Sequence, residues 1–495
     1  MNARLKEDWL TSDPSEEDEI HVDSFAGCGG TTTGLEAAGL TVHIAINHNR
    51  PAVAVHRANH PDTEHYCEDV WDVDPKTVCR GRRVGSFWLS PDCTHHSRAR
   101  GGRPFRDRRR AHRTRGLAWL AIHWAKEVAP RIIRLENVCE FADWGPLTAD
   151  GTPCPMRKGF TFRRFVKRLQ NLGYEVDWRE LRACDYGAPT SRKRLFLIAR
   201  RDGRPIIWPE PTHGRGLLPY RTAGECIDWS ILCPSIFDRQ RKLVPATLRR
   251  IARGLRKFVI ETDNPYVVEL GNEGGTWSGK RLIGATLIQT SYGERRGQAP
   301  RVPGLHKPLG TVVAGGAKHA LVVAFLAKNY GGHESSGSSA HAPLDTITTK
   351  DHNALVTARM TPPGSSPERV RAFLMEYYST DQNPHLDEPL RTVTTKDRFA
   401  IVLVRGEEYV IEDICMRLLT PRELLRAQGF PESYIIDYGL VDDGHGGTRR
   451  ITLATSQKVR LCGNSNPPPL AEALARVEGQ AESQRIPQFQ SGRLF

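Results

Sequence analysis

Hydrophobic and polar positions follow two alternating periods over the first 215 residues. Apolar residues recur at helical spacing in three stretches, which predict helices at 31–38, 117–128 and 162–172. Short runs of aliphatic and β-branched residues lie between these stretches. Strands that alternate with helices are typical of an α/β fold with a doubly wound, mostly parallel sheet. The apolar runs predict strands at 20–25, 42–46, 84–89, 132–135 and 195–199.

This rhythm stops in the middle of the chain. Residues 216–410 are richer in Gly, Thr, Ser and short β-type runs, which predicts an inserted, mainly β region. A Pro-Leu-x-Thr pattern occurs there at Pro308, Pro343 and Pro389. The spacing is too irregular for a solenoid, so we interpret the repeat as a duplicated β-hairpin-like unit. Helical patterns return from Met416.

The pattern therefore divides the chain into five parts. A first α/β domain is interrupted by the β region and completed by helices near the end of the chain, and both ends are expected to be flexible. The expected parts are an acidic tail at 1–18, an α/β domain at 19–215, the inserted region at 216–410, a completing part at 411–477 and a polar tail at 478–495.

The net charge of the chain indicates what kind of partner it binds. The chain of 495 residues carries a net charge of +13, with 39% apolar and 26% charged residues, which excludes wholesale disorder. A basic surface favours nucleic acid, anionic membranes or acidic ligands. Nine arginines lie within 97–116, and guanidinium groups suit phosphate oxygens. We expect an exposed loop that leads into a helix there. A second basic cluster, within 239–257, fits either phosphate contact or a solvated helix face.

Several classes of protein are disfavoured. No apolar run is long enough to span a bilayer, and the acidic N-terminus lacks the basic segment and following apolar segment of a secretory signal. We therefore expect a cytoplasmic protein that does not bind a membrane. The 11 cysteines are scattered without a CxxC pair, which argues against a disulfide scaffold and a zinc ribbon. His95 and His96 have no companion ligands at zinc spacing, so no metal is expected.

Chemically active residues follow several of the predicted strands. A glycine turn comes after the first strand, Cys93 comes after the strand at 84–89, and Glu136 directly follows the strand predicted at 132–135. Parallel sheets bind ligands beyond the carboxyl ends of their strands. A single cysteine is most often an inert core thiol, but polar flanks and a positive local field favour a thiolate at Cys93. Arg192 and Arg194, two residues apart, lie on one side of an extended chain.

Taken together and in this order, six motifs resemble those of the DNA cytosine-5 methyltransferase family, over nearly the whole chain. The resemblance implies a Rossmann-like methyltransferase sheet with an inserted, mainly β target recognition domain at 216–410. The motifs are the glycine loop Asp23–Gly30, Ser90–Ser97 (SPDCTHHS), Leu135–Val138 (LENV), Tyr186–Arg194, Thr420–Pro431 and Gly463–Pro468.

The resemblance implies a reaction and its catalytic residues. Cys93 would add to C6 of a flipped cytosine in a specific duplex DNA sequence, which activates C5 for methylation. Glu136 would act at the N3 and amino edge of the base, and Arg192 and Arg194 would stabilise charge. Arg98, Arg100, Arg103 and Arg106 are expected to contact the DNA backbone.

The resemblance also implies S-adenosyl-L-methionine as the cofactor, with Asp69 facing the adenine amino group. The expected partners are double-stranded DNA and, as a candidate, a cognate restriction endonuclease, and the chain is expected to be a monomer. The cofactor-binding residues implied by the resemblance are Asp23, Phe25, Gly27, Gly29, Asn47, Asp69, Pro91 and Asn464.

The chain departs from the family pattern at a few positions. Asn47 stands where an acid usually holds the ribose hydroxyls, and Asp92 replaces the proline before the nucleophile. A neighbouring carboxylate should raise the pKa of Cys93 unless Arg98, Arg100 or His95 offsets it.

Three other functions compete with this reading. An RNA cytosine methyltransferase is the nearest alternative, and the long insert at 216–410 favours a DNA enzyme over it. A DNA-binding regulator with a dead active site is disfavoured by the intact Cys93, Glu136 and arginine pair. A nicotinamide oxidoreductase would explain the glycine loop but not Cys93.

Overall fold

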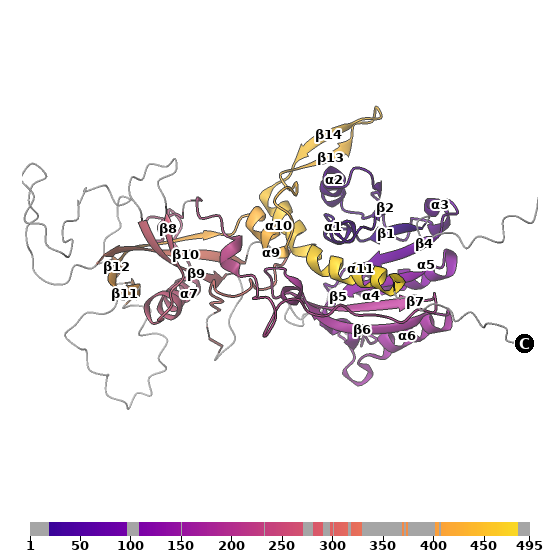
Figure 1. Cartoon of the computed structure of the whole chain (residues 1–495), viewed down its shortest axis with the longest axis horizontal. Helices are drawn as coiled ribbons and strands as arrows, with labels where there is room; N and C mark the ends of the chain where they lie inside the picture. The colour runs from indigo at the N-terminus through magenta and orange to yellow at the C-terminus, as the bar shows by residue number, and fades with distance from the viewer. Residues whose placement is uncertain are drawn as a thin grey trace, which may run out of the picture. The chain divides into compact units, whose positions relative to one another are not determined.

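The computed structural model divides into two compact units, drawn in Figure 1. The first unit comprises the described parts of Met1–Cys226, Lys307–Ala317 and Thr420–Phe495, and the second those of Ile227–His306 and Lys318–Leu419. The structure describes residues 19–96, 108–149, 151–231, 233–270, 281–290, 298–299, 301–314, 318–328, 369–370, 373–374, 401–404 and 407–483.

The first unit is built on a seven-stranded sheet with the order β3-β2-β1-β4-β5-β7-β6. Strands β1 to β5 run parallel, and β7 lies antiparallel between β5 and β6. The predicted doubly wound, mostly parallel sheet is therefore confirmed. The strands are β1 (Ile20–Ser24), β2 (Val42–Ile46), β3 (Glu64–Tyr66), β4 (Val84–Leu89), β5 (Ile132–Asn137), β6 (Glu175–Arg182) and β7 (Lys193–Arg200).

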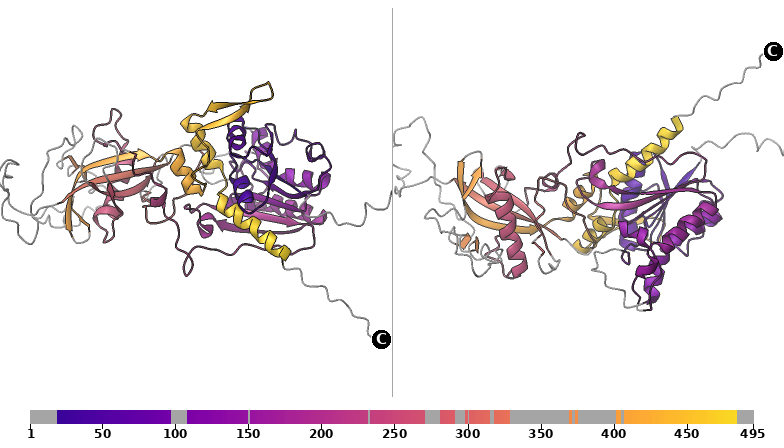
Figure 2. Two further views of the ribbon diagram at one scale, coloured as in Figure 1. Left: turned by 45° about the horizontal axis from the view of Figure 1, so that its top comes forward. Right: turned by 90° about the horizontal axis from the view of Figure 1, so that it is seen from below.

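Helices cover both faces of this sheet. Apolar residues of α1 (Gly30–Ala37) and α11 (Pro468–Ser483) pack on one face, where Trp88 and Phe196 point. Figure 2 shows α11, in yellow, lying along the sheet although it comes from the far end of the sequence. The remaining helices of this unit are α2 (Arg50–Asn59), α3 (Pro75–Cys79), α4 (Arg108–Gly116), α5 (Leu120–Glu127), α6 (Phe160–Asn171), α9 (Pro421–Gln428) and α10 (Thr455–Asn464).

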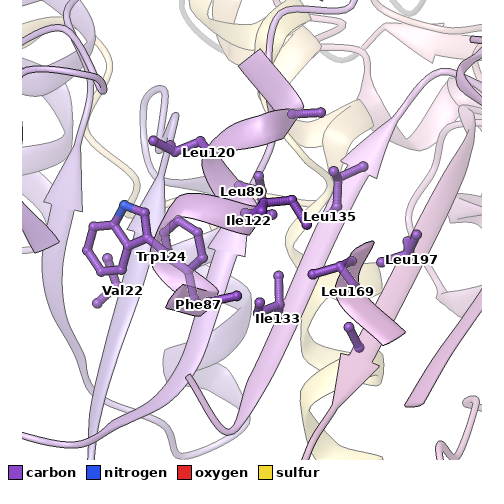
Figure 3. Packing of buried hydrophobic residues seen from close by; sticks show 14 of the residues in the cluster. Val22, Phe87, Leu89, Leu120, Ile122, Trp124, Ile133, Leu135, Leu169 and Leu197 are labelled. Carbon is purple, nitrogen blue, oxygen red and sulfur yellow. The ribbon is translucent and has the colours of Figure 1, made fainter. Parts of the chain in front are cut away.

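The main core lies on the other face, beneath α5 and α6 (Figure 3). Strand residues two positions apart point to the same side, so Phe87 and Leu89 of β4 both enter this core. The ring of Phe87 stacks on that of Trp124 at 4.3 Å between centroids, and both are fully buried. Burying such side chains stabilises the fold by roughly 1.5–3 kcal/mol each. Leu89 and Leu135 of this core lie at or near the ends of β4 and β5, close to the candidate residues Cys93 and Glu136.

Some elements differ from the expectation. Helix α4 begins at Arg108, so the second half of the arginine-rich stretch is helical rather than part of a loop. Strand β6 and the hairpin formed by β13 (Tyr438–Asp442) and β14 (Thr448–Thr452) were not predicted. Most residues of β6 and β14 are exposed and polar, so these strands give only a weak apolar signal.

The second unit is mainly β, as predicted for the inserted region. Its antiparallel sheet has the order β11-β12-β10-β9-β8, next to α7 (Pro245–Leu255). Arg250 of α7 is 2% exposed, so this member of the basic cluster belongs to neither a solvated face nor an open phosphate surface. The strands are β8 (Val267–Leu270), β9 (Arg281–Gln289), β10 (His319–Lys328), β11 (Ile401–Val404) and β12 (Glu407–Leu418).

The boundaries between the units also differ from the expected 216 and 410. The second unit begins at Ile227, because the turn Ala223–Cys226 belongs with the first unit, where Ala223 N donates to the carbonyl of Lys307 at 2.8 Å. It ends at Leu419, because β12 runs on to Leu418. Pro308 of the repeat falls in the first unit, whereas Pro343 and Pro389 lie outside the described residues.

Candidate active site

Three parallel strands bring the candidate catalytic residues to one edge of the sheet. In the register of β1, β4 and β5, Ser24 lies beside Leu89 and Leu89 beside Leu135. The loops that follow these strands therefore emerge together. Two hydrogen bonds join them, from Ser90 N to the Ser24 carbonyl at 3.2 Å and from Asn137 Nδ2 to the Pro91 carbonyl at 3.2 Å. The loop carrying Cys93 is thus fixed between its neighbours.

The residue before the nucleophile shapes this loop. Asp92 Oδ1 accepts a hydrogen bond from Thr94 N at 2.7 Å, and His96 N donates to the Cys93 carbonyl at 2.9 Å. An aspartate side chain that bonds the backbone two residues on forms an Asx-turn. Asp92 thus supplies a turn restraint at the position where the family usually has proline.

Glu136 is held by two arginines, one in the neighbouring strand and one directly before it. Strand β7 lies antiparallel to β5, and Glu136 is opposite Phe196, two residues from Arg194. Arg194 Nε lies 3.2 Å from Glu136 Oε1, and Arg192 Nη2 lies 3.7 Å from the same oxygen. Glu136 is 7% exposed. A largely buried carboxylate is thus compensated by two cations.

The two arginines have different supports. Arg192 is 5% exposed, and its Nη1 donates to the carbonyl of Gly463 at 3.0 Å and to that of Val312 at 3.4 Å. Burial lowers the pKa of Arg192 to about 10, so it remains a cation at neutral pH. Arg194 Nη1 donates to the carbonyl of Lys193 at 2.7 Å. The contacts of Arg192 tie the predicted pair to the end of α10.

The pKa of the Cys93 thiol is raised. Burial is the largest cause, Arg194 opposes it, Glu136 adds to it, Arg192 opposes it and Asp92 adds to it. The effect of Asp92 has the predicted sign, and the arginines favour the thiolate, but burial outweighs them and the pKa is raised overall. The opposing cations described here are Arg194 of β7 and Arg192 just before it, whereas Arg98 and Arg100 lie outside the described residues.

The glycine loop has the backbone of a ligand cradle. Gly27 and Gly29 have φ of 59° and 96°, and Phe25 also has a positive φ of 62°. Left-handed backbone strongly favours glycine, and a non-glycine residue there marks a strained position. A Cβ on Gly30 would collide with the carbonyl of Asn466. The loop therefore lets backbone, rather than side chains, face a ligand.

Asn47, Asp69 and Pro91 follow strands that end along the same edge. The strands lie in the order β3-β2-β1-β4, so the loops that follow them lie side by side in that order. Asn47 Oδ1 accepts from Asn49 N at 2.8 Å, and Asp69 Oδ2 is paired with Arg113 Nη2 at 2.5 Å. Asn464 is exposed at the end of α10, whereas Asn466, which was not predicted, is buried.

Buried polar atoms in this region fit a polar ligand. Asp23 Oδ1, Ser24 Oγ and Asn466 Oδ1 are buried and have no hydrogen-bond partner within the described part of the chain. Buried polar groups normally have partners, so each of these unpaired atoms leaves a hydrogen bond that a polar ligand can supply. Asn466 Nδ2 also donates to Thr31 Oγ1 at 3.5 Å, which places it beside the start of α1.

Sequence reasoning also missed a buried arginine next to the nucleophile loop. Arg115 of α4 is 5% exposed, and its Nη2 donates to the Gly145 carbonyl at 2.7 Å while Nη1 lies 3.2 Å from His95 Nδ1. Burial lowers the pKa of Arg115 to about 10. The surrounding arginines hid this residue, because composition alone cannot tell a buried arginine from a solvated one.

The chain matches the family described as C-5 cytosine-specific DNA methylase over residues 21–215 and 344–479. This match covers more than half of the sequence and contains Cys93, Glu136 and both arginines. The chain belongs to this family. The α/β fold of a DNA cytosine-5 methyltransferase with a separate, mainly β unit is therefore shown.

Individual relatives are similar over a part of their length. The chain is 30% identical over 200 residues to Type II methyltransferase M.AgeI of Thalassovita gelatinovora, covering 39% of this chain and 42% of that protein. It is 28% identical over 211 residues to Type II methyltransferase M1.HphI of Haemophilus parahaemolyticus, covering 42% and 51%. The chain thus aligns with about half the length, or less, of these curated relatives.

Two further features concern membranes and metal ions. Among the described residues, no helix is long and apolar enough to cross a membrane. The same part of the chain contains no group of three or more His, Cys, Asp or Glu side chains that could hold a metal ion.

Proposed function

We propose that this family member transfers a methyl group from S-adenosylmethionine to C5 of cytosine in a specific duplex DNA sequence. The observation that carries the proposal is the ion pair between Arg194 and Glu136 at 3.2 Å. Glu136 lies in β5, which pairs with β4, and the Cys93 loop follows β4. A nucleophile, a carboxylate and fixed cations beside a ligand cradle match the needs of this reaction.

Cys93 is the proposed nucleophile. C5 of cytosine reacts poorly by itself, so the reaction first forms a bond from the Cys93 sulfur to C6. C5 then has enamine character and takes the methyl group. Loss of the C5 proton and breakage of the C6–S bond release 5-methylcytosine and restore the thiol. Since burial raises the pKa of Cys93, Arg194 and Arg192 assist by stabilising the thiolate.

Glu136 is proposed to act at the N3 and amino edge of the base. Attack at C6 moves electron density into the ring, and a proton held at N3 stabilises it. The contacts of Arg194 and Arg192 fix the carboxylate in place before the base arrives. Fixed charges that need no rearrangement are the most effective form of electrostatic catalysis. A cytosine inside a duplex cannot reach such a buried site, so we propose that it is flipped out.

The glycine loop is the proposed cofactor site. Asp23, Phe25, Gly27 and Gly29 would line it, and the unpaired buried oxygens around the loop support a polar ligand there. When bound, S-adenosylmethionine supplies an electrophilic methyl group on a sulfonium. Asn47, Asp69, Pro91 and Asn464 are the further residues proposed for this site.

The substrate and its surroundings are also proposals. Arg98, Arg100, Arg103 and Arg106 are proposed to contact the DNA backbone, and they lie outside the described residues. The inserted region would read the base sequence through side chains that reach base edges. A cytoplasmic monomer, with a cognate restriction endonuclease as a candidate partner, completes the proposal.

An acceptor comparison tests this function. Labelled S-adenosylmethionine is incubated with the full chain and duplex DNA, RNA or no acceptor, next to Cys93→Ala. We expect label in DNA as 5-methylcytosine and none with Cys93→Ala. Transfer to RNA alone would replace the proposed substrate, and transfer that persists in Cys93→Ala would exclude the mechanism. Bisulfite sequencing of DNA from cells that express the chain then identifies the target sequence.

A further inference from the structure

A chain of hydrogen bonds runs from a buried carboxyl group behind the glycine loop to the edge of the sheet. Thr32 Oγ1 lies 2.9 Å from Asp23 Oδ2 and 3.0 Å from His56 Nε2. His56 Nδ1 lies 2.9 Å from His65 Nε2. Asp23 and Thr32 are fully buried, His56 is 1% exposed and His65 is half-buried. Four elements, β1, α1, α2 and β3, thus join an interior acid to a residue near solvent.

Asp23 lies between uncharged residues of the two adjacent strands. Its neighbours on the adjacent strands are Ala45 of β2 and Trp88 of β4, which carry no charge. Its Oδ1 atom is buried without a hydrogen-bond partner there. The nearby titratable and charged groups from the packed elements are His56, His60 and Arg57 of α2, Glu36 of α1, His65 of β3, Cys28 of the glycine loop and Tyr434 after α9.

The carboxyl group, rather than the histidines, titrates near neutral pH. Burial raises the pKa of Asp23 to about 7, although the hydrogen bonds from Thr32 oppose the rise. Burial holds the pKa of His56 well below its usual 6.5, and burial with nearby Arg57 lowers that of His65 to about 4. Both histidines are therefore neutral at pH 7 and can pass a proton without holding it.

We propose that Asp23 distinguishes the charged cofactor from its neutral product. The inference rests on the proposed cofactor site, because Asp23 lies one residue before the end of β1, the strand that leads into the glycine loop. S-adenosylmethionine carries a sulfonium cation, whereas S-adenosylhomocysteine has an uncharged thioether. An unpaired, buried carboxylate is stabilised by a nearby cation and becomes protonated beside a neutral ligand. Asp23 is thus ionised with the substrate and protonated with the product.

The hydrogen-bond chain supplies a path for the proton. With Asp23 protonated, its O–H donates to Thr32, Thr32 donates to His56 Nε2, and His56 Nδ1–H donates to His65 Nε2. When the carboxyl group ionises, each proton moves along one hydrogen bond, so that His65 gains one on Nε2 and gives one from Nδ1 to solvent. One proton leaves in total and every other group stays neutral.

The two ligands make a sharp test. They share the adenosine, amino and carboxylate groups, so the ratio of their dissociation constants isolates the sulfonium charge. Calorimetric titrations of the full chain with each ligand are made between pH 6 and 8.5, in buffers with different ionisation enthalpies. We expect S-adenosylmethionine to release more protons than S-adenosylhomocysteine at pH 6. Its relative affinity should rise up to about tenfold per pH unit below pH 7 and then level off.

Three variants separate the parts of the inference. Asp23→Asn should abolish the pH dependence of the affinity ratio. Thr32→Val keeps the side-chain shape but removes a hydrogen bond that lowers the pKa of Asp23, so the transition should move to higher pH. It also interrupts the path, so proton release followed with an indicator dye should lag behind binding. His123→Gln, on α5 outside this network, should leave the wild-type curve unchanged.

The possible outcomes are distinguishable. A ratio that stays constant from pH 6 to 8.5, in a chain that binds both ligands and methylates DNA, would overturn the inference alone. An unmoved transition in a folded Thr32→Val variant would do the same. Failure to bind either ligand would overturn the proposed function instead.

Discussion

Arg194 Nε lies 3.2 Å from Glu136 Oε1, so one arginine of β7 acts on both a carboxylate and the neighbouring thiol. The positive charge of Arg194 lowers the pKa of Cys93, and the negative charge of Glu136 raises it, against a background of burial that dominates. Removing the charge of Arg194 should therefore raise the pKa of the Cys93 thiol, whereas removing that of Glu136 should lower it.

Arg194→Gln should raise the pKa of Cys93 further, and Glu136→Gln should lower it. Both variants should lose activity, with kcat reduced by about 10²–10³ for Arg194→Gln, because a fixed charge is lost. The measurement is the pH dependence of iodoacetamide alkylation, followed by mass spectrometry on the Cys93 peptide. Lys193→Gln is the matched control, since Lys193 is exposed and pairs with Glu180. Equal alkylation curves in both variants would contradict the assigned charges.

Asp92 has two separable effects on the nucleophile loop. Asp92→Asn should lower the pKa of Cys93 slightly and keep kcat, because an asparagine oxygen can still accept from Thr94 N. Asp92→Ala should lower the pKa similarly but reduce kcat, since the turn restraint is lost. Alkylation and single-turnover rates measure the two effects. If both variants keep the same kcat, the turn does not position Cys93.

Gly30 has no room for a side chain. Gly30→Ala should strongly weaken cofactor binding, by an expected tenfold or more, because the added Cβ would meet the Asn466 carbonyl. Gly116→Ala is the control, since nothing lies within 4 Å of its added Cβ. Isothermal titration with S-adenosylmethionine compares the variants. Equal affinities would show that this packing does not shape the site.

His319 should make the second unit sensitive to acid. This residue is 2% exposed, and burial lowers its pKa in the folded state to about 4. An unfolded histidine, with a pKa of about 6.5, binds protons more readily, so its unfolding is favoured as the pH falls from 6.5 toward 4. The cost is about 1.4 kcal/mol for each pH unit. Above pH 6.5 the residue has no such effect.

His319→Gln should flatten this dependence. Hydrogen exchange of β9 and β10 peptides at pH 5 and pH 7, corrected for intrinsic rates, measures the local free energy of opening. His306→Gln, at an exposed position of the same unit, is the control. A wild-type chain with equal protection at both pH values would contradict the prediction.

The sequence predicts the buried strands best. Strands β2 (Val42–Ile46) and β4 (Val84–Leu89) have the predicted bounds, because strands buried on both faces are rich in apolar residues. Strand β6 (Glu175–Arg182) lies at the sheet edge and is largely exposed, so its charged residues give no such signal. Hydrophobic pattern therefore reports burial, and it misses elements that are held mainly by backbone hydrogen bonds.

The sequence predicted those residues of the candidate site that belong to recognisable motifs. Cys93, Glu136, Arg192 and Arg194 belong to recognisable motifs, and the structure shows Glu136 clamped by both arginines. Contacts between distant segments have no such signature. The Asn466 contact with α1 joins residues separated by 435 positions, and no local spacing encodes it.

The hydrogen bond from Arg192 to the Gly463 carbonyl has a consequence for synthesis on the ribosome. These residues are 271 positions apart, so the nucleophile loop and both arginines leave the ribosome long before their support exists. Helix α11, which covers one face of the sheet, emerges later still. A nascent chain therefore cannot form the Arg192–Gly463 hydrogen bond, and the proposed active site should be complete only after α10 and α11 have been translated.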